Sequence, residues 1–257
     1  MNKYSEIIKS LIKKFNFKIE HADSWYKRNE HYVAEQNEVE SNFIKTIGNY
    51  SMSTPANHWA IIQSIKHIHE NKIEGDVVEC GVWKGGNLIL FKKMMDYLNI
   101  QKKIYAYDTF DGMSLPTDDD SDLKNIKAEN TYKKYESKDM KWCYSSLEEV
   151  KNNIKKYDKE FDKNFEFIKG KVEDTLINSD NLPDKISLLR LDTDFYESTK
   201  IELELLFPKL SIGGVLIIDD YGHWQGSKKA VDEYFQLDSN FLWFHRIDYA
   251  SRLYIKT

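Results

Sequence analysis

The sequence predicts an α/β protein built on a doubly wound, mainly parallel sheet of seven strands, with a Rossmann-like alternation of strands and helices. Short apolar segments alternate with segments of helical periodicity between residues 75 and 235. The apolar segments are continuous, which is typical of strands buried on both faces of a parallel sheet. Two more apolar segments near the C-terminus are close enough in the chain to form an antiparallel edge hairpin.

The expected elements follow one another without an internal repeat or a flexible linker. Strands are expected at residues 75–81, 102–108, 164–170, 186–192, 213–220, 241–247 and 251–257. Helices are expected at residues 86–98, 145–158, 199–207 and 227–235. In the second of these helices Leu147, Val150 and Ile154 fall on one face, because they are spaced three or four residues apart.

Two segments fall outside this alternation. Residues 1–55 precede the first strand and are expected to form a helical extension that serves as a lid or an oligomer contact, leaving residues 56–257 as the sheet domain. A long polar stretch, residues 111–145, follows the second strand and is expected to form a lid insertion. Its acidic run at residues 118–122 is expected to be solvated surface rather than a ligand cluster.

Composition and charge exclude several classes of protein. The chain has 257 residues, 41% of them hydrophobic, so it can bury an ordinary core and is not a disordered chain. Its formal net charge is −5 with scattered acids and bases, so neither a nucleic-acid nor a membrane partner is expected. No stretch resembles a membrane span or a signal peptide. Two cysteines, Cys80 and Cys143, are too few for a disulfide framework, and a cytoplasmic location is expected.

The first expected strand runs into a glycine-rich turn, ECGVWKGGN, before the next helix begins. Ligands of open α/β sheets bind beyond the carboxyl ends of the strands, and glycines there let a ligand approach the backbone and the N–H groups of the helix. The spacing G-x-x-x-G-G differs from that of dinucleotide sites, so a plain strand-to-helix turn is the alternative. The candidate ligand residues of this turn are Glu79, Gly81, Gly85, Gly86 and Asn87.

The second expected strand ends in an acid, Asp108. A carboxylate at this place can accept hydrogen bonds from both hydroxyls of a ribose. An isolated aspartate here is more often a helix cap or a turn residue. Together with the glycine turn on another strand end, Asp108 favours a nucleoside-type ligand.

Two further expected strands each end in a pair of aspartates. Asp192 and Asp194 end one strand, and Asp219 and Asp220 end the strand that should be its neighbour. Parallel neighbours lie about 5 Å apart, so these carboxylates would repel one another unless a cation joins them. Magnesium takes oxygen ligands of this kind. Capping of the following helices is the alternative, but it explains one of the four acids rather than all of them.

Five blocks of the sequence, GDVVECGVWKGGN, YAYDTFDGM, FIKGKVEDTL, LLRLDTDFYEST and GGVLIIDDYGHWQGSKKAVDEYF, carry a family resemblance. In their order and spacing they resemble the macrocin O-methyltransferase family, over about residues 50–236. The resemblance implies a class I methyltransferase fold and an enzyme that methylates sugar hydroxyls of macrolides and related natural products. It also implies dependence on S-adenosylmethionine and magnesium. The strand order and the acids are similar to those of catechol O-methyltransferase, a more distant relative in which three strand-end residues hold magnesium.

The resemblance further implies roles for the candidate residues. The methionine half of the cofactor would be held by Glu79, Gly81 and residues 84–87, which include Gly85, Gly86 and Asn87. Asp108 would bind the ribose. The residues expected near the adenine are Gly170, Lys171, Val172 and Glu173. The expected magnesium ligands are Asp192, Asp219 and Asp220, with Asp192 also beside the cofactor. Asp194 would lie behind the ligands or accept a proton.

One departure from the family concerns the general base. Characterised members use a histidine of the lid, whereas residues 70–222 of this chain contain no histidine. His223, three residues after Asp220, is the nearest substitute, and a loop histidine without a special role is the alternative. A metal could also lower the pKa of the acceptor hydroxyl enough for a weaker base such as Asp194.

These observations predict a metal-dependent O-methyltransferase whose acceptor is a hydroxyl of a sugar or sugar-containing small molecule, either a secondary metabolite or a precursor of a surface polysaccharide. A nucleotide-sugar glycosyltransferase with a metal-binding DTD motif is one alternative, but it leaves the glycine turn unexplained. A catalytically inactive S-adenosylmethionine-binding protein is the other, and it would not need the acids. The N-terminal extension and the resemblance favour a homo-oligomer, a dimer or larger.

Overall fold

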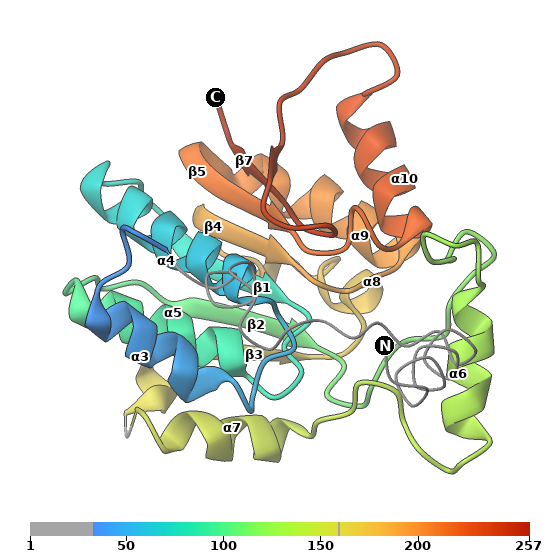
Figure 1. Cartoon of the computed structure of the whole chain (residues 1–257), viewed down its shortest axis with the longest axis horizontal. Helices are drawn as coiled ribbons and strands as arrows, with labels where there is room; N and C mark the ends of the chain where they lie inside the picture. The colour runs from blue at the N-terminus through green and yellow to red at the C-terminus, as the bar shows by residue number, and fades with distance from the viewer. Residues whose placement is uncertain (1–32, 159) are drawn as a thin grey trace, which may run out of the picture. The chain divides into compact units, whose positions relative to one another are not determined.

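Seven strands form one mixed sheet in this computed structural model, which describes residues 33–158 and 160–257. The strands are β1 Asp76–Cys80, β2 Ile104–Asp108, β3 Phe165–Lys169, β4 Ile186–Leu191, β5 Leu210–Ile218, β6 His245–Arg246 and β7 Arg252–Ile255. Their order is β3-β2-β1-β4-β5-β7-β6, with β1 to β5 parallel and β7 antiparallel to both of its neighbours (Figure 1). The predicted sheet is therefore confirmed, including its antiparallel edge.

The N-terminal extension is described only in part. Residues 1–32, where a helical extension is expected, lie outside the described residues. One compact unit runs from Asn37 to Thr257 and contains α3, Glu38–Ile47, as well as the sheet. Phe43 and Ile44 of α3 pack against the core of that unit. The domain boundary near residue 55 stays a prediction.

The pairing register places the two acid-bearing strand ends side by side. Leu191 of β4 is aligned with Ile218 of β5, so the residues that follow them, Asp192 and Asp219, leave the sheet at the same level. On the other side of β4, Arg190 is aligned with Glu79 of β1. The predicted neighbour relation of the two strands is thus confirmed.

The C-terminal hairpin is shorter than expected. β6 contains only two residues, and the apolar residues before it stay outside the sheet. Phe241 and Trp243 are 92% and 74% exposed. Phe244, directly before β6, does pack against the core, in contact with the rings of Phe235 and Tyr254. Apolar character alone was therefore a poor guide to the length of this strand.

Helices cover both faces of the sheet (Figure 1). Besides α3, they are α4 Pro55–Glu70, α5 Gly86–Tyr97, α6 Ala128–Glu136, α7 Leu147–Lys155, α8 Val172–Thr175, α9 Tyr196–Leu205 and α10 Gln225–Phe235, with short 3-10 turns at Phe161–Lys163, Ser179–Asn181 and Phe207–Lys209. α3, α4, α5 and α7 contribute to one apolar cluster, and α8, α9 and α10 contribute to the other. Successive strand residues alternate between the clusters, as Val77 and Val78 do, which confirms the doubly wound arrangement.

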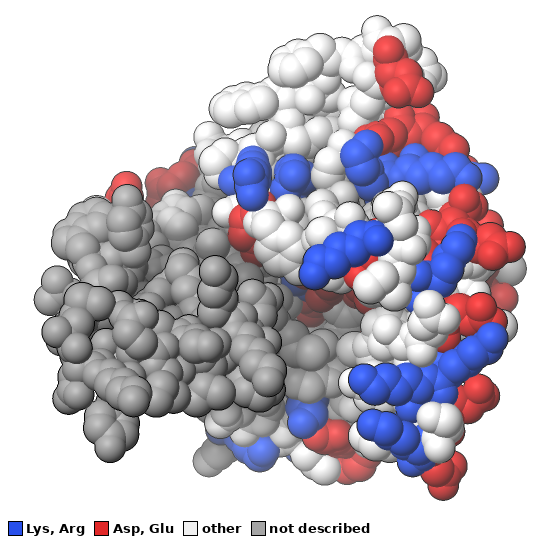
Figure 2. Space-filling view, turned by 45° about the vertical axis from the view of Figure 1, so that its right-hand side comes forward, with Lys and Arg blue, Asp and Glu red and all other residues white. Residues whose placement is uncertain are grey.

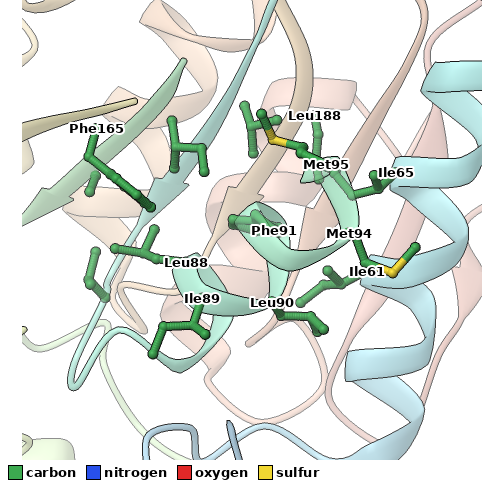
Figure 3. Close-up of a cluster of buried hydrophobic side chains, with 14 of the residues drawn as sticks. Ile61, Ile65, Leu88, Ile89, Leu90, Phe91, Met94, Met95, Phe165 and Leu188 are labelled. Atoms are coloured by element: carbon green, nitrogen blue, oxygen red, sulfur yellow. The ribbon is translucent and has the colours of Figure 1, made fainter. Parts of the chain in front are cut away.

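The helix after the glycine turn, α5, is buried on nearly every side (Figure 3). Leu88 and Phe91 of α5 belong to the same apolar cluster as Leu188 of β4, and Met94 packs with Ile61 of α4. Full burial of each such side chain contributes about 1.5–3 kcal/mol. The apolar run that the sequence shows here therefore fixes the turn before it, because α5 cannot shift without opening the core.

The helix α4, like the shorter α6 and α8, was not among the helices expected from the sequence. Thr54 caps α4 by accepting a hydrogen bond from the Asn57 N–H at 3.2 Å, and Pro55 occupies its first turn. Ile61 and Ile65 then face the core. The signals were present as a Thr-Pro start followed by isoleucines at helical spacing, and the helix carries Asn57 to the site.

The lid expected at residues 111–145 contains α6 and packs on the start of α10. Trp142 lies 5.9 Å from the Trp224 ring and 6.1 Å from the Phe195 ring, measured between ring centroids. The acidic run is only partly solvated as expected: Asp118 is exposed, but Asp120 is 1% exposed. Asp120 accepts a hydrogen bond from the Tyr196 N–H at 2.9 Å, at the start of α9, so one acid of the run holds the lid to the sheet domain.

Acidic and basic side chains are interleaved on the face shown in Figure 2. Exposed ion pairs of the described chain include Lys133–Glu129 at 2.6 Å and Lys229–Asp119 at 2.9 Å. Among the residues that the structure describes, no helix combines the length and the apolar character needed to cross a membrane.

Candidate active site

The glycine turn between β1 and α5 is built by close backbone contacts. Gly81 has φ +83°, and a Cβ on it would lie 1.9 Å from the carbonyl oxygen of Asp192. Gly85 has the same φ and forms the N-cap of α5. Since only glycine adopts these conformations without strain, Gly81 lets the end of β1 lie against Asp192 after β4, and Gly85 lets α5 begin close to Val150 of α7.

Asp108 ties this turn to the end of β2. Its Oδ2 accepts hydrogen bonds from the Val82 N–H at 2.7 Å and the Trp83 N–H at 3.2 Å, and its Oδ1 accepts one from the Phe110 N–H at 2.6 Å. Burial raises the pKa of Asp108, and these backbone donors oppose the rise. A ribose bound here would have to share the two carboxylate oxygens with the turn.

A pocket that we call the turn pocket opens above these residues. It is lined among others by Gly81, Asp108, Gly170, Val172, Asp192 and Asp194. Lys171 and Glu173 also line it, so seven of the residues expected at the cofactor come together here. Cys143 reaches it from the lid, and burial together with the nearby carboxylates raises the pKa of its thiol to about 12.

The other residues expected at the cofactor do not line the turn pocket. Gly86 and Asn87 line the neighbouring pocket, and Glu79 and Gly85 line neither. Glu79 is 1% exposed, and its Oε1 accepts hydrogen bonds from Asn87 at 3.0 Å and Arg190 at 2.9 Å. Burial raises the pKa of Glu79 to about 7 against the opposing charge of Arg190. Glu79 thus supports the glycine turn through its hydrogen bond with Asn87 and does not line either pocket.

A second pocket, the acid pocket, lies beside the first. It is lined among others by Ser51, Asn87, Asp192, Asp219, Asp220 and His223. Both pockets share Val82, Trp83, Asp192, Asp194 and Met52, so a molecule in one can touch a molecule in the other. Trp142 of the lid also lines the acid pocket.

Three carboxylates converge where the two pockets meet. Oxygens of Asp192, Asp194 and Asp220 all lie within 4.8 Å of one another. The pKa of each is raised, first by burial and then by the neighbouring carboxylates, and that of Asp194 rises to about 8. The backbone of Asp194 is left-handed, with φ +70°, and its N–H donates a hydrogen bond to Asp220 Oδ2 at 3.2 Å. Such a cluster offers hard oxygen ligands to a divalent cation.

Asp219, the remaining acid expected to bind metal, is oriented by neighbours and is not part of this triad. Its Oδ1 accepts hydrogen bonds from Asn57 Nδ2 and from Ser251 Oγ, the latter at 2.9 Å, and pairs with Arg190 Nη2 at 2.9 Å. The side chain still lines the acid pocket. Partners of this kind commonly fix the direction of a metal-binding carboxylate.

Arg190 is one of the site residues that the sequence did not indicate. It is fully buried and pairs with Glu79 at 2.9 Å, with Asp192 at 2.6 Å and with Asp219 at 2.9 Å. Its Nη2 also donates to Ser53 Oγ at 3.1 Å, which joins the segment before α4 to the sheet. The available signal was a single arginine inside an apolar strand, because such a charge must find partners when buried.

His223 lies at the rim of the acid pocket. Its Nδ1 is 3.2 Å from the Tyr249 hydroxyl, and its ring meets the Trp224 ring edge-on at 4.9 Å. Within the described chain its Nε2 has no hydrogen-bond partner. His58, which was not considered from the sequence, contacts Ser51 Oγ through Nε2 at 2.9 Å, but burial and Arg190 lower its pKa to about 4.

A sheet with β7 inserted antiparallel between β5 and β6, and with a pocket over the β1–α5 turn, defines the class of S-adenosylmethionine-dependent class I methyltransferases. The solved structure of the O-methyltransferase NovP matches with a TM-score of 0.70 and 29% identity, over 81% of this chain and 82% of that one. The family profile of macrocin-O-methyltransferase (TylF) matches residues 8–255. The chain therefore belongs to this family, as the resemblance predicted, and is an O-methyltransferase.

Two relatives illustrate the family. A demethyldecarbamoylnovobiocin O-methyltransferase of Streptomyces niveus is 31% identical over 205 residues, which cover 76% of this chain and 74% of the relative. The 8-demethyl-8-(2,3-dimethoxy-alpha-L-rhamnosyl)-tetracenomycin-C 4'-O-methyltransferase of Streptomyces olivaceus is 31% identical over 163 residues. The latter match covers 63% of this chain and 58% of the relative.

Proposed function

We propose that this protein transfers the methyl group of S-adenosylmethionine to a hydroxyl of a sugar ring, with the help of a divalent metal, magnesium first of all. The observation that supports this most is the junction of the two pockets at Asp192 and Asp194. A cofactor in the turn pocket and an acceptor in the acid pocket would meet beside a cluster of carboxylates. The acceptor class rests on relatives such as the enzyme named for a rhamnosyl tetracenomycin.

The turn pocket would hold the cofactor in the orientation that the resemblance implies. Gly81 gives the methionine half close access to the backbone, Asp108 accepts the ribose hydroxyls, and the segment from Gly170 to Glu173 borders the adenine. When bound, S-adenosylmethionine would supply a sulfonium methyl group, whose carbon the acceptor oxygen would attack in line as the bond to sulfur breaks and S-adenosylhomocysteine leaves. The contribution of the protein is to fix the distance and direction between the two pockets.

The acids of the junction fit a hard divalent cation. Asp192 and Asp220 belong both to the expected ligand set and to the triad whose oxygens converge. We assign the third place to Asp219, because Arg190, Asn57 and Ser251 fix the direction of its carboxylate. When bound, magnesium lowers the pKa of an acceptor hydroxyl and fixes its orientation.

The proton of the acceptor would pass to His223 or to Asp194. His223 lines the acid pocket, and the contact of its Nδ1 with Tyr249 leaves Nε2 free to face the acceptor. Asp194 lies at the junction itself. His58 is a poorer base because its pKa is lowered to about 4. Trp142 and Cys143 of the lid would exclude water from the two pockets.

Calorimetry and metal binding test the proposal together. S-adenosylmethionine is titrated into the full-length protein with and without magnesium, and Mn²⁺ binding is followed by electron paramagnetic resonance. Asp108→Asn should weaken cofactor binding at least tenfold and leave Mn²⁺ affinity unchanged. Asp220→Asn should do the reverse. Absence of cofactor binding at every magnesium concentration would contradict the proposal, and hydrolysis of a UDP-sugar would favour the glycosyltransferase alternative.

A matched pair of variants decides the third metal ligand. Asp219→Asn should lower Mn²⁺ affinity more than Asp194→Asn if the assignment is right. The opposite order would make Asp194 the ligand and leave the proton to His223. A homo-oligomeric assembly and a cytoplasmic location stay part of the proposal, and sedimentation of the full-length protein checks the first of them.

A further inference from the structure

A groove continues from the acid pocket on the far side of His223. This outer groove is lined among others by Tyr221, His223, Trp224, Lys228, Asp232 and Arg252. His223 and Trp224 line the acid pocket as well. An acceptor whose hydroxyl lies at the carboxylates could therefore extend past His223 into the outer groove.

Arg252 of β7 is the distinctive side chain of the outer groove. Its Nη1 donates to the Ser251 carbonyl oxygen at 2.9 Å, and its Cζ lies 5.2 Å from the centroid of the Tyr221 ring. Lys228 Nζ lies 5.4 Å from the same centroid. Within the described chain Arg252 forms no ion pair, and its Nη2 and Nε have no hydrogen-bond partner. Most of its donor edge is thus uncommitted.

A second arginine stands directly opposite Arg252. Arg246 of β6 is aligned with Arg252 in the β6–β7 register, and its Nε donates to the Asp248 carbonyl oxygen at 2.9 Å. Like charges directly opposite on neighbouring strands destabilise a sheet. Burial and, after it, the charge of Arg246 lower the pKa of Arg252. No described carboxylate forms an ion pair with either guanidinium.

Apart from the exposed carboxylate of Asp238, the remaining charged residues that line the outer groove are committed to partners. Lys228 pairs with Asp232, and Lys229 pairs with Asp119 at 2.9 Å. Glu233 accepts a hydrogen bond from the Tyr196 hydroxyl at 2.7 Å. The arginine pair therefore stands out as positive charge without a counter-ion, and conflicts of this kind are expected at functional sites.

We propose that the outer groove binds an anionic group of the acceptor, a phosphate ester or a carboxylate, through Arg252, with Arg246 beside it as a second positive charge. The guanidinium presents a planar set of donors that matches either oxyanion. The acceptor would then be an acidic sugar or a phosphorylated sugar, including a nucleotide-linked one, rather than a neutral glycoside. This inference rests on the proposed function, because it takes the acid pocket as the acceptor site.

Calorimetry with three sugars tests the proposal on the full-length protein. Glucose 1-phosphate, glucuronate and glucose are titrated into protein saturated with S-adenosylhomocysteine, in EDTA and at low salt. At least one of the two anions should bind tenfold or more tightly than glucose, and added salt should weaken it. The tighter of the two identifies phosphate or carboxylate as the group recognised. Equal affinity of all three sugars would overturn the proposal.

Variants connect the binding to the arginine pair. Arg252→Gln should reduce the affinity for the preferred anion tenfold or more, and Arg246→Gln, which removes the neighbouring charge without changing the lining of the groove, should reduce it severalfold. Lys229→Gln, which lines the same groove but removes a side chain paired with Asp119, should leave it unchanged. If Arg252→Gln does not fold, Arg246→Gln decides. Anion binding that neither arginine variant changes would overturn the assignment.

The same titrations separate this inference from the proposed function. Failure of S-adenosylhomocysteine to bind the wild-type protein would contradict the proposed function. Normal cofactor binding with no preference for the anionic sugars would contradict only the outer groove as an anion site.

Discussion

The turn pocket and the acid pocket share residues but are built in different ways. The turn pocket is lined largely by residues at or just after strand ends, with Gly81, Asp108 and Gly170 each close to the end of a strand. The acid pocket is formed by side chains from distant segments, such as Asn57 of α4, Asp219 after β5 and Trp142 of the lid. A site made from backbone geometry serves one ligand for a whole class of enzymes, whereas a site made from side chains adapts to one acceptor.

The difference also concerns charge. Beneath the acid pocket the fully buried Arg190 pairs with the buried Glu79 and with Asp192 and Asp219, whose side chains are 27% and 19% exposed. The turn pocket depends instead on glycine conformations and on the hydrogen bonds that Asp108 accepts from backbone N–H groups. Replacement of Arg190 should therefore damage the acid pocket most, and replacement of a glycine should damage the turn pocket most.

The largest effect is expected from Arg190→Met. Methionine has a similar length but no charge, so three carboxylates would lose their common partner inside the protein. Breaking a buried ion pair in this way costs about 3–5 kcal/mol. Urea unfolding of wild type and variant measures the loss, with Lys185→Met as control, because Lys185 forms an exposed pair with Glu74. A loss below about 1 kcal/mol would show that the network does not stabilise the fold.

A slightly smaller effect is expected from pH acting on Glu79. Its pKa is raised from 4.5 to about 7 by burial, so the folded protein holds this proton at pH values where the unfolded chain has released it. The contribution to stability is therefore complete below about pH 4.5 and is lost as the pH rises through about 7. The loss amounts to about 3 kcal/mol.

Unfolding of the metal-free protein at pH 5 and pH 8 measures this contribution. Glu79→Gln should reduce the difference between the two pH values, because glutamine cannot ionise. The raised pKa values of Asp192 and Asp220 act in the same direction and should leave a residual slope. An unchanged slope in the variant would mean that Glu79 is already ionised in the folded protein at pH 5.

The turn pocket is tested by Gly81→Ala. Its Cβ would lie 1.9 Å from the Asp192 carbonyl oxygen at a φ of +83°. A left-handed conformation costs about 1–2 kcal/mol for a residue other than glycine, and the contact also forces the two strand ends apart. We expect about 2 kcal/mol less stability and at least tenfold weaker binding of S-adenosylhomocysteine.

Gly48→Ala is the matched control for this substitution. Gly48 has φ −56°, and its Cβ would be 3.6 Å from the nearest atom, the Lys45 carbonyl oxygen. This variant should keep full cofactor binding. Normal cofactor affinity in Gly81→Ala would mean that the turn does not approach the ligand as proposed.

Much of the turn pocket could be predicted from the sequence because its signals are local. The apolar strand at 75–81, the glycines after it and Asp108 lie within short windows, and the β4–β5 pair followed from alternation of strands and helices. Arg190 could not be placed in the same way. Its three acidic partners come from β1, from the end of β4 and from the end of β5, and only the folded register brings them together.

The burial of the acidic residues in the lid could not be predicted from the sequence either. Substitutions among them are expected to have the smallest effects on stability. Asp119 and Asp120 are adjacent and chemically identical, yet the Asp119 side chain is 43% exposed and pairs with Lys229. Asp120 is 1% exposed and accepts hydrogen bonds from the Tyr196 N–H at 2.9 Å and the Thr117 N–H at 2.7 Å. Composition gives no means of telling the two acids apart, because only the position of α9 does so.

Alanine substitution at both positions converts this contrast into a measurement. Asp120→Ala leaves buried N–H donors without a partner and should cost about 1–3 kcal/mol of unfolding free energy. Asp119→Ala removes an exposed ion pair and should cost about 0.2–1 kcal/mol. Because Asp120 joins the lid to the start of α9, its variant should also expose the lid to limited proteolysis, whereas the Asp119 variant should resist it as the wild type does. Equal losses in the two variants would mean that the lid is held by its aromatic contacts, chiefly Trp142 against Trp224, rather than by the buried carboxylate.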